Sequence, residues 1–218
     1  MMQKRKENNS GIINFISGNK QCMVRLSYFV LFTLYFLFSA SCNSPFTQKP
    51  RGYYSIAFPE KKYQLFDKPG YPYSFEYPVY ATVTKDSLFF NGDTENPWWV
   101  NIDFPQFSGK IYMSYKGIGK NKLENLINDA FNLTNKHSIK ADNIEDSLLA
   151  NASGVHGMYF KVEGDVATGN QFFLTDSVQH FLRGSLYFYA TPNHDSIQPV
   201  NDFIKQDMMH LISTFKWK

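Results

Sequence analysis

One uninterrupted apolar run near the N-terminus divides this chain into a leader and a part that can fold. The run, LSYFVLFTLYFLF, occupies Leu26–Phe38, and Arg25 precedes it. The small residues Ser39–Ser41 and then Cys42 follow it. A basic start, a short apolar core and a small-residue cleavage region are the parts of a secretory signal. A membrane-spanning helix needs about 17–25 residues. The run has only 13, so we expect cleavage rather than retention.

Cys42 predicts a lipid anchor, because a cysteine directly after the cleavage region can be acylated, for example with palmitate. A lipobox usually has Leu three positions earlier, where this chain has Ser39. An ordinary secretory signal and a retained N-terminal helix therefore remain alternatives. Met23 would begin a compact signal by itself, which would make residues 1–22 an over-extended start. We take residues 1–41 as the signal, 42–50 as a lipidated tether and 51–218 as a single globular domain.

The net charge changes once the leader is set aside. The whole sequence has 22 Lys and Arg residues and 19 Asp and Glu residues, of which the leader holds five and one. Residues 42–218 therefore carry 17 basic and 18 acidic side chains, a net charge of −1. Such a balance offers no basic field to attract nucleic acid, so we expect no nucleic-acid partner.

The residue types that usually carry chemistry are sparse. The two cysteines, Cys22 and Cys42, lie outside the expected domain, which leaves it no disulfide and no cysteine metal site. The five histidines include no pair at the i, i+4 spacing of a helical zinc site. A nucleophile elbow, a phosphate loop and a dinucleotide fingerprint are also missing from the sequence. We expect no metal, no cofactor and no enzymatic activity.

Alternating apolar and polar residues predict strands in the first half of the domain. The expected strands are Tyr53–Phe58, Tyr73–Val83, Trp98–Phe104 and Ile111–Tyr115. Pro72 and Pro78 make the second of these an edge strand, an interrupted strand or a bulge, because proline cannot donate to a ladder. The short PQFSG segment between the last two predicts a hairpin.

The second half predicts two helices and three further strands. A helix is expected over about Lys120–His137, and the following Ile139–Leu149 fits either its continuation or a strand. The three later strands are expected at Val155–Val162, Gly169–Thr175 and His180–Ala190. An amphipathic helix should follow, with Ser196 as its N-cap and Pro199 in its first turn.

This order of elements predicts an α+β domain, an antiparallel β-sheet flanked by helices. It resembles the PsbP/Mog1-like α/β/α sandwich, including a terminal helix that ends in Ser213, Thr214 and Phe215. A resemblance at this level concerns the fold and says little about function.

The segment Thr175–Gly184 gathers the residue types of an active site. Ser177 and His180 would lie across a hairpin loop, where Asp and Ser commonly bond to the turn backbone. An activated nucleophile instead needs a base that is held in a sheltered pocket. We therefore favour turn stabilisation, and we keep Asp176, His180 and Arg183 as candidates for a partner-binding loop.

Aromatic residues offer a second functional clue. Six tyrosines near the start of the domain exceed what one core needs, and tyrosine is enriched at protein interfaces. They are Tyr53, Tyr54, Tyr63, Tyr71, Tyr73 and Tyr77. They indicate either an exposed contact surface or positions in the core and along a sheet edge. The carboxylates Glu76 and Asp103 are expected on the solvent faces of their strands.

Several long strings resemble the gliding motility lipoprotein GldD family. They are PRGYYSIAFPEKKYQLFD (50–67), PYSFEYPVYA (72–81), VNIDFPQFSGKIYMSYK (100–116), KHSIKAD (136–142), QFFLTDSVQHFLRGSLYF (171–188) and LISTFKW (211–217). They occur in the same order over nearly the whole domain. The resemblance implies a lipoprotein of the gliding machinery of Bacteroidota, which is coupled to type IX secretion. It carries over no catalytic residue and transfers one functional position, Cys42 as the lipid attachment site.

Two functions follow as expectations. The first is a non-catalytic assembly or stabilising factor that binds protein components of the gliding and type IX secretion apparatus. It is expected to be lipid-anchored in the cell envelope, at the outer membrane and facing the periplasm. The second is an envelope ligand-binding protein or hydrolase that acts on peptidoglycan, glycan or lipid through the 176–183 loop.

Overall fold

The computed structural model describes residues 25–35, 55–86, 97–119 and 121–218. They belong to two compact units, Met1–Gly52 and Tyr53–Lys218. In the first unit, residues 25–35 form a helix. Among the described residues, no helix has both the length and the apolar character needed to cross a membrane. Cys42 and the predicted tether 42–50 lie outside the described residues.

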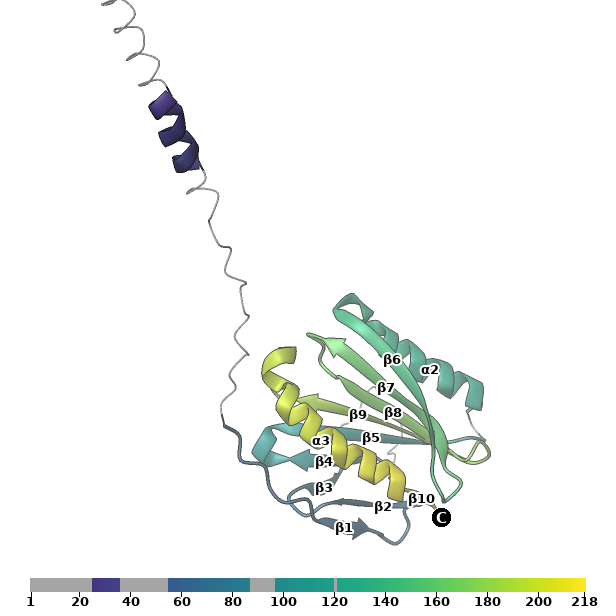
Figure 1. Ribbon diagram of the computed structural model, residues 1–218. Coiled ribbons are helices and arrows are strands. Elements are labelled where there is room, and N and C mark those ends of the chain that lie inside the picture. The colour runs from purple at the N-terminus through teal and green to yellow at the C-terminus, as the bar shows by residue number, and fades with distance from the viewer. Residues whose placement is uncertain (1–24, 36–54, 87–96, 120) are drawn as a thin grey trace, which may run out of the picture. The chain divides into compact units, whose positions relative to one another are not determined.

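The second unit is built on a large antiparallel sheet (Figure 1). Within the described ranges the strands lie in the order β3 (Thr82–Lys85), β4 (Val100–Phe104), β5 (Gly109–Gly117), β9 (His180–Phe188), β8 (Asn170–Thr175), β7 (His156–Gly164) and β6 (Ala141–Ala150). Each strand from β6 to β9 pairs with its neighbour in the chain, as expected for hairpins. The non-local pair is β5 with β9, whose register runs from Gly109↔Phe188 to Gly117↔His180.

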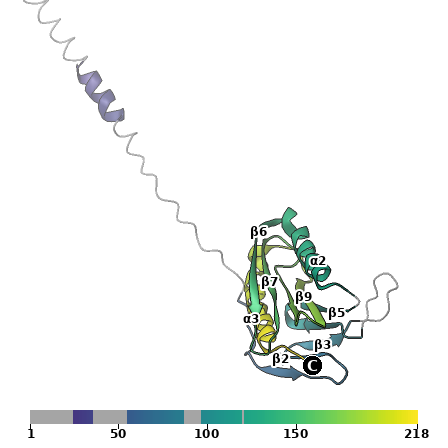
Figure 2. The ribbon, with the colours of Figure 1, turned by 90° about the vertical axis from the view of Figure 1, so that its right-hand side faces the viewer.

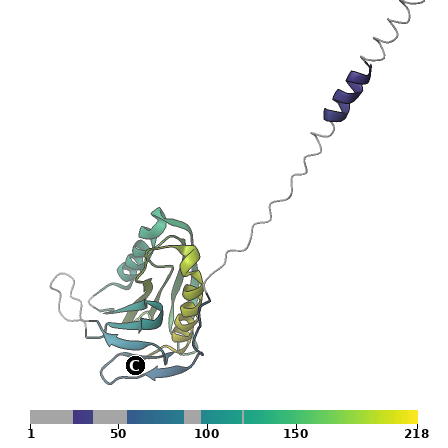
Figure 3. The ribbon, with the colours of Figure 1, turned by 90° about the vertical axis from the view of Figure 1, so that its left-hand side faces the viewer.

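A smaller sheet lies at the β3 end of the unit. Its central strand β2 (Tyr73–Pro78) pairs with β1 (Tyr63–Phe66) on one side and β10 (Lys216–Trp217) on the other. The last residues of the chain therefore return to the first strands, and the C-terminus lies beside β2 (Figure 3).

Helices cover both faces of the large sheet. The helix α3 (His194–Thr214) lies on one face and α2 (Leu123–Asn135) on the other (Figure 2). A 3₁₀ turn, Lys136–Ile139, follows α2, and another, Pro105–Phe107, joins β4 to β5. The predicted α+β architecture, an antiparallel sheet flanked by helices, is confirmed.

The larger core fills the space between the sheet and α3. Residues at every second position of β4 and β5 face it, among them Ile102 and Met113, because side chains alternate along a strand. From α3 the residues Ile204, Met208 and Leu211 are at most 1% exposed. Their spacing of four and three positions is the apolar stripe predicted for this helix.

The smaller core lies under α2 and covers only part of the opposite face. Leu126 and Ala130 of α2 pack on Phe160, Phe173 and Phe181 of β7, β8 and β9. On β4, β5 and the end of β9 the same face carries polar and tyrosine side chains instead. We call this part the open half-face and define it by Asp103, Lys110, Tyr112, Tyr187 and Tyr189. Figure 2 shows α2 near β6, β7 and β9 and away from β3.

The first strand begins later than predicted. Tyr53 and Tyr54 lie outside the described residues, and residues 55–62 form no strand, so the predicted strand Tyr53–Phe58 is wrong over 55–58. Side-chain contacts, rather than hydrogen bonds to a neighbouring strand, hold this segment on the domain. Phe58 stacks on Phe203 of α3, with ring centroids 4.4 Å apart.

The next prediction, an interrupted strand at Tyr73–Val83, is confirmed. The strand β2 ends at Pro78, a turn follows, and the chain enters the large sheet as β3. The N–H of Ala81 donates to the carbonyl of Pro78 over 3.0 Å and closes this turn. The proline thus separates two strands that belong to different sheets.

The structure also decides between helix and strand for Ile139–Leu149 and shows where the last helix begins. Residues Ala141–Ala150 form the strand β6, so Ile139–Leu149 does not continue the helix. Helix α3 starts at His194 because the side chain of Asn193 caps it, accepting the N–H of Ser196 over 3.1 Å. The prediction of Ser196 as N-cap is therefore wrong. Pro199 lies inside the helix, beyond its first turn.

The tyrosines of residues 63–77 are part of the core and its edge. Tyr73 is 0% exposed, and Tyr71 and Tyr77 pack against the larger core. The alternative of an exposed contact surface is wrong for these residues. The reason is that β1, β10 and Phe215 together cover β2.

Candidate functional site

Asp176 organises the loop between β8 and β9. One carboxylate oxygen, Oδ1, accepts the backbone N–H groups of Val178, Gln179 and His180 over 2.9–3.0 Å. Burial alone would raise the pKa of Asp176, but these N–H donors outweigh it and hold the pKa below its usual range. Ser177 takes a left-handed backbone conformation, with φ at 64°. The predicted turn-stabilising role of this aspartate is confirmed.

His180 lies at the start of β9, on the face that α3 covers. Its Nδ1 is 2.6 Å from the Tyr115 hydroxyl, and its ring stacks on Trp217 with centroids 5.0 Å apart. The distance from Nε2 to the Asp176 carboxylate is 4.0 Å. Burial and the charge of Asp176 raise the pKa of Tyr115. A tyrosine that stays protonated is a hydrogen-bond partner for the imidazole, not a nucleophile.

Arg183 lies on the opposite face of the same strand. Three positions separate it from His180, and side chains alternate between the faces of a strand, so the two point away from each other. Arg183 Nη2 donates to Oε1 of the buried Gln171 on β8. The structure therefore brings Asp176 and His180 together and places Arg183 in a different environment.

That environment is a groove of about 850 Å³ between α2 and the large sheet. We call it the Arg183 groove. Its residues from the sheet side include Trp99, Ser114, Phe181 and Arg183, and those from α2 include Leu126 and Leu133. Arg183 was predicted to belong to the loop with Asp176 and His180, but it lines this groove instead. The periodicity of β9 was the signal that could have placed it under α2 instead.

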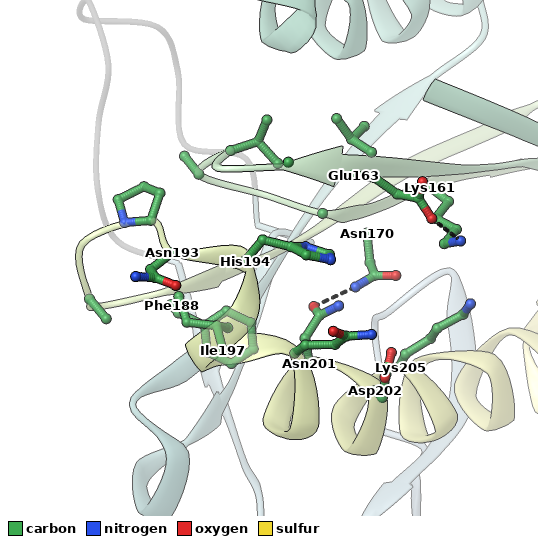
Figure 4. Close-up of a pocket in the computed structure, with 18 residues that line it drawn as sticks. Lys161, Glu163, Asn170, Phe188, Asn193, His194, Ile197, Asn201, Asp202 and Lys205 are labelled. Atoms are coloured by element: carbon green, nitrogen blue, oxygen red, sulfur yellow. Dashed lines mark hydrogen bonds and ion pairs between the residues drawn. The ribbon is translucent and has the colours of Figure 1, made fainter. Parts of the chain in front are cut away.

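A second cavity, of about 300 Å³, lies between the turn after β7 and the first turns of α3 (Figure 4). Asn170 crosses it and donates through Nδ2 to Asn201 Oδ1 over 2.6 Å, while Tyr159 donates to Asn170 Oδ1. The charged side chains that line it include Lys161 and Glu163, which pair with each other. Because Tyr159, Asn170 and Asn201 bond to one another across it, we interpret this cavity as part of the contact that holds α3 on β7 and β8.

A third polar cluster surrounds Asp207 of α3, which is 1% exposed. Its carboxylate accepts from Lys61, Tyr63 and Tyr80. Burial and then the charge of Asp207 raise the pKa of Tyr63 to about 12. Burial lowers the pKa of Lys61 even though the carboxylate opposes the change. The members of this cluster come from three distant segments, so no local pattern in the sequence predicts it.

Within the described residues, no group of three or more His, Cys, Asp or Glu side chains could hold a metal ion. The carboxylates expected on solvent faces are only partly buried. Asp103 pairs with Lys110 over 2.9 Å, and Glu76 lies 2.7 Å from Nε2 of His210. The first contact is a surface ion pair of the ordinary kind, and the second is a hydrogen bond between partly exposed side chains.

Comparison with known proteins gives one family. The model of the family described as gliding motility lipoprotein GldD matches residues 43–217. No curated protein matches the chain. Among solved structures, the chain is similar to cyanobacterial PsbP (CyanoP) from Synechocystis sp. PCC 6803, with 12% sequence identity and a TM-score of 0.41. That alignment covers 78% of this chain and 99% of the other.

Proposed function

Because the chain belongs to the gliding motility lipoprotein GldD family, we propose that it is a non-catalytic component of the gliding machinery that assembles or stabilises a protein complex. The family match over 43–217 is the observation that carries this proposal. Its partners would be protein components of the gliding and type IX secretion apparatus. The family is defined by motility rather than by a reaction, which supports a binding role.

The anchor in this proposal is a lipid on Cys42. Membership in a lipoprotein family implies attachment to the cell envelope. We propose that this anchor lies in the outer membrane and that the domain faces the periplasm. The second part is supported by the absence of acidic residues from 43–50, because acidic residues just after the lipidated cysteine are expected to mark export to the cell surface in this bacterial group. An anchor of this kind raises the effective concentration of the domain near a membrane-bound partner.

The contact surface in this proposal is the open half-face. Tyr112 and Tyr189 are joined through their hydroxyls over 3.0 Å, and Tyr112 packs edge-on against Tyr187. Lys110, paired with Asp103, lies 5.5 Å from the centre of the Tyr112 ring. Tyrosine is enriched at protein interfaces, where its few free torsions keep the entropic cost of binding low. The loop with Asp176 and His180, whose tip residue Val178 is 71% exposed, offers a second contact.

A deletion strain tests the proposal. Colony spreading and the extracellular proteome would be scored after complementation with the wild type, with Cys42→Ala and with the double variant Tyr112→Ala/Tyr189→Ala. We expect reduced spreading for both variants, with wild-type amounts of folded protein. Leu148→Ala is the matched control, since Leu148 on β6 is 84% exposed and far along the sheet order from β5. Full function of a soluble Cys42→Ala protein would contradict the anchor, and full function of the tyrosine variant would contradict the surface.

The hydrolase alternative has one supporting observation, the chain of Tyr115, His180 and Asp176. It requires His180→Ala to abolish function while the melting temperature stays unchanged. If the variant is instead less stable, His180 acts by packing on Tyr115 and Trp217.

A further inference from the structure

The Arg183 groove has the size and the walls of a ligand site. Small-molecule sites occupy about 300–1,000 Å³ and are mostly apolar with a few polar groups. This groove measures about 850 Å³. Leu126, Ala130 and Leu133 of α2 share one helix face at spacings of four and three, and that face forms one wall. Trp99 and Phe181 add apolar surface from the sheet.

Positive charge predominates in the groove. Three cations line it, Lys116, Lys136 and Arg183, against the single carboxylate of Asp129. The guanidinium also acts on the neighbouring His137, whose pKa is lowered by burial and further by Arg183. The net positive charge of the groove favours anionic ligands over neutral or cationic ones.

Arg183 itself is the strongest single feature. It is half-buried, and this burial lowers the pKa of its guanidinium. Among the described residues its hydrogen-bond partner is the neutral Gln171, and no carboxylate forms an ion pair with it. A cation that burial removes from part of its water shell is stabilised by an anionic partner. The planar guanidinium fork fits a carboxylate or a phosphate in a bidentate manner.

The residues beside Arg183 orient its side chain, and two of them keep polar atoms without a hydrogen-bond partner in the protein. Register places Arg183 between Ser114 of β5 and Phe173 of β8, and one hydrogen bond to Gln171 Oε1 orients its head. Gln171 Nε2 and Ser185 Oγ are buried on the same face and have no protein partner. The sheet thus supplies an oriented cation within a polar patch next to an apolar wall.

We propose that the Arg183 groove binds a small amphiphilic anion, with the carboxylate or phosphate held by Arg183 and the apolar part against Leu126, Leu133 and Phe181. The anion could belong to a lipid-like molecule or to a soluble aromatic or aliphatic acid, and the shared chemistry is an oxyanion on an apolar body. The groove lies beside the open half-face on the same side of the sheet but shares no defining residue with it, and the proposal does not depend on the proposed motility function.

The test is calorimetric titration of the full chain in dodecyl maltoside. The probes are 1-naphthyl phosphate and 2-naphthoate, with inorganic phosphate as the bare anion and 2-naphthamide as the uncharged analogue. We expect both naphthyl anions to bind and both comparison compounds to bind about tenfold more weakly or worse. Arg183→Gln should weaken the naphthyl anions by about tenfold or more, the loss expected for one charge-assisted hydrogen bond. The affinities for dodecyl phosphate and 1-naphthyl phosphate are then compared. Tighter binding of dodecyl phosphate indicates a lipid-like ligand, and tighter binding of 1-naphthyl phosphate indicates a soluble acid.

Lys205→Gln is the matched control, because Lys205 lines the other cavity, and it should leave binding unchanged. Arg183→Lys should bind more weakly than the wild type, since a lysine lacks the fork. If Arg183→Gln fails to fold, Lys116→Gln/Lys136→Gln replaces it and should also weaken binding. Absent binding of both naphthyl anions, equal binding of inorganic phosphate, or unchanged affinity in Arg183→Gln would overturn the proposal.

Discussion

Lys61 and Asp207 form an ion pair of 2.7 Å although 146 positions separate them in the chain. The Asp207 carboxylate also accepts the hydroxyls of Tyr63 over 3.0 Å and Tyr80 over 2.5 Å. Lys61 donates in addition to the carbonyl of Phe203 over 2.8 Å. One buried carboxylate therefore joins the irregular segment before β1, the turn after β2 and the middle of α3.

We expect Asp207→Ala to lower the free energy of unfolding by about 3–5 kcal/mol, because it leaves the partly buried Lys61 unpaired. Urea unfolding followed by circular dichroism measures this. The control is Lys62→Ala, since the Lys62–Glu60 pair is 65% and 77% exposed and should contribute about 0–1 kcal/mol. The double variant Lys61→Met/Asp207→Leu should recover part of the loss. A loss under about 1 kcal/mol in Asp207→Ala would contradict this account.

Asp176 should make stability depend on acid. Its pKa is held below the usual range by three backbone N–H groups that outweigh burial. A carboxyl with a depressed folded pKa contributes stability above its unfolded pKa of about 3.9, and that contribution disappears as the pH falls through the folded value. Asp176→Asn should therefore be less stable than the wild type at pH 7, and the difference should shrink below about pH 4.

Urea unfolding at pH 7 and pH 3 measures the difference, with Asp142→Asn, an exposed aspartate on β6, as the control. A gap between Asp176→Asn and the wild type that stays constant across this range would show that the charge of Asp176 has no part in holding the loop.

The local elements of this fold could be predicted from sequence, whereas the long-range contacts could not. The hairpin of β8 and β9 was predicted because Asp176 and Ser177 are a local turn signal. The choice of Asn193 over Ser196 as the cap of α3 is undecided locally, since both residue types cap well. The burial of Tyr73 depends on β10, a pairing of two residues from the far end of the chain that no periodicity reveals.

The candidate site shows the same contrast between local features, which could be predicted from sequence, and long-range contacts, which could not. Sequence proximity grouped His180 with Arg183, but the alternation of a strand separates them onto opposite faces. The groove around Arg183 exists only because α2 returns to pack on β7, β8 and β9. Charge and composition could not indicate that contact.

Gly157 should be the glycine least tolerant of a side chain. A Cβ there would overlap the carbonyl oxygen of Phe173, which is backbone of the paired strand β8 and cannot move alone. We expect Gly157→Ala to lower the free energy of unfolding by about 3 kcal/mol, the upper part of the range for overpacking. Thermal and urea unfolding measure it. Gly119→Ala is the control, because a Cβ at Gly119 meets nothing within 4 Å, and it should change stability by less than about 1 kcal/mol. Similar stabilities for the two variants would show that β7 and β8 can separate freely at this point.

The pKa of His137 reports the charge of the Arg183 groove without any ligand. Burial lowers this pKa, and Arg183 lowers it further. Arg183→Gln should therefore raise it, yet leave it below about 6.5, because the burial remains. When a histidine has a lower pKa in the folded state than in the unfolded state, the protein loses stability as the pH falls below the unfolded pKa. The wild type should lose more stability than Arg183→Gln between pH 7 and pH 5.

Titration of the imidazole by NMR gives the pKa of His137 directly, with Lys205→Gln as the control that should not change it. An unchanged pKa in Arg183→Gln would mean that the guanidinium charge is screened from the groove, which would remove the electrostatic basis for anion binding there.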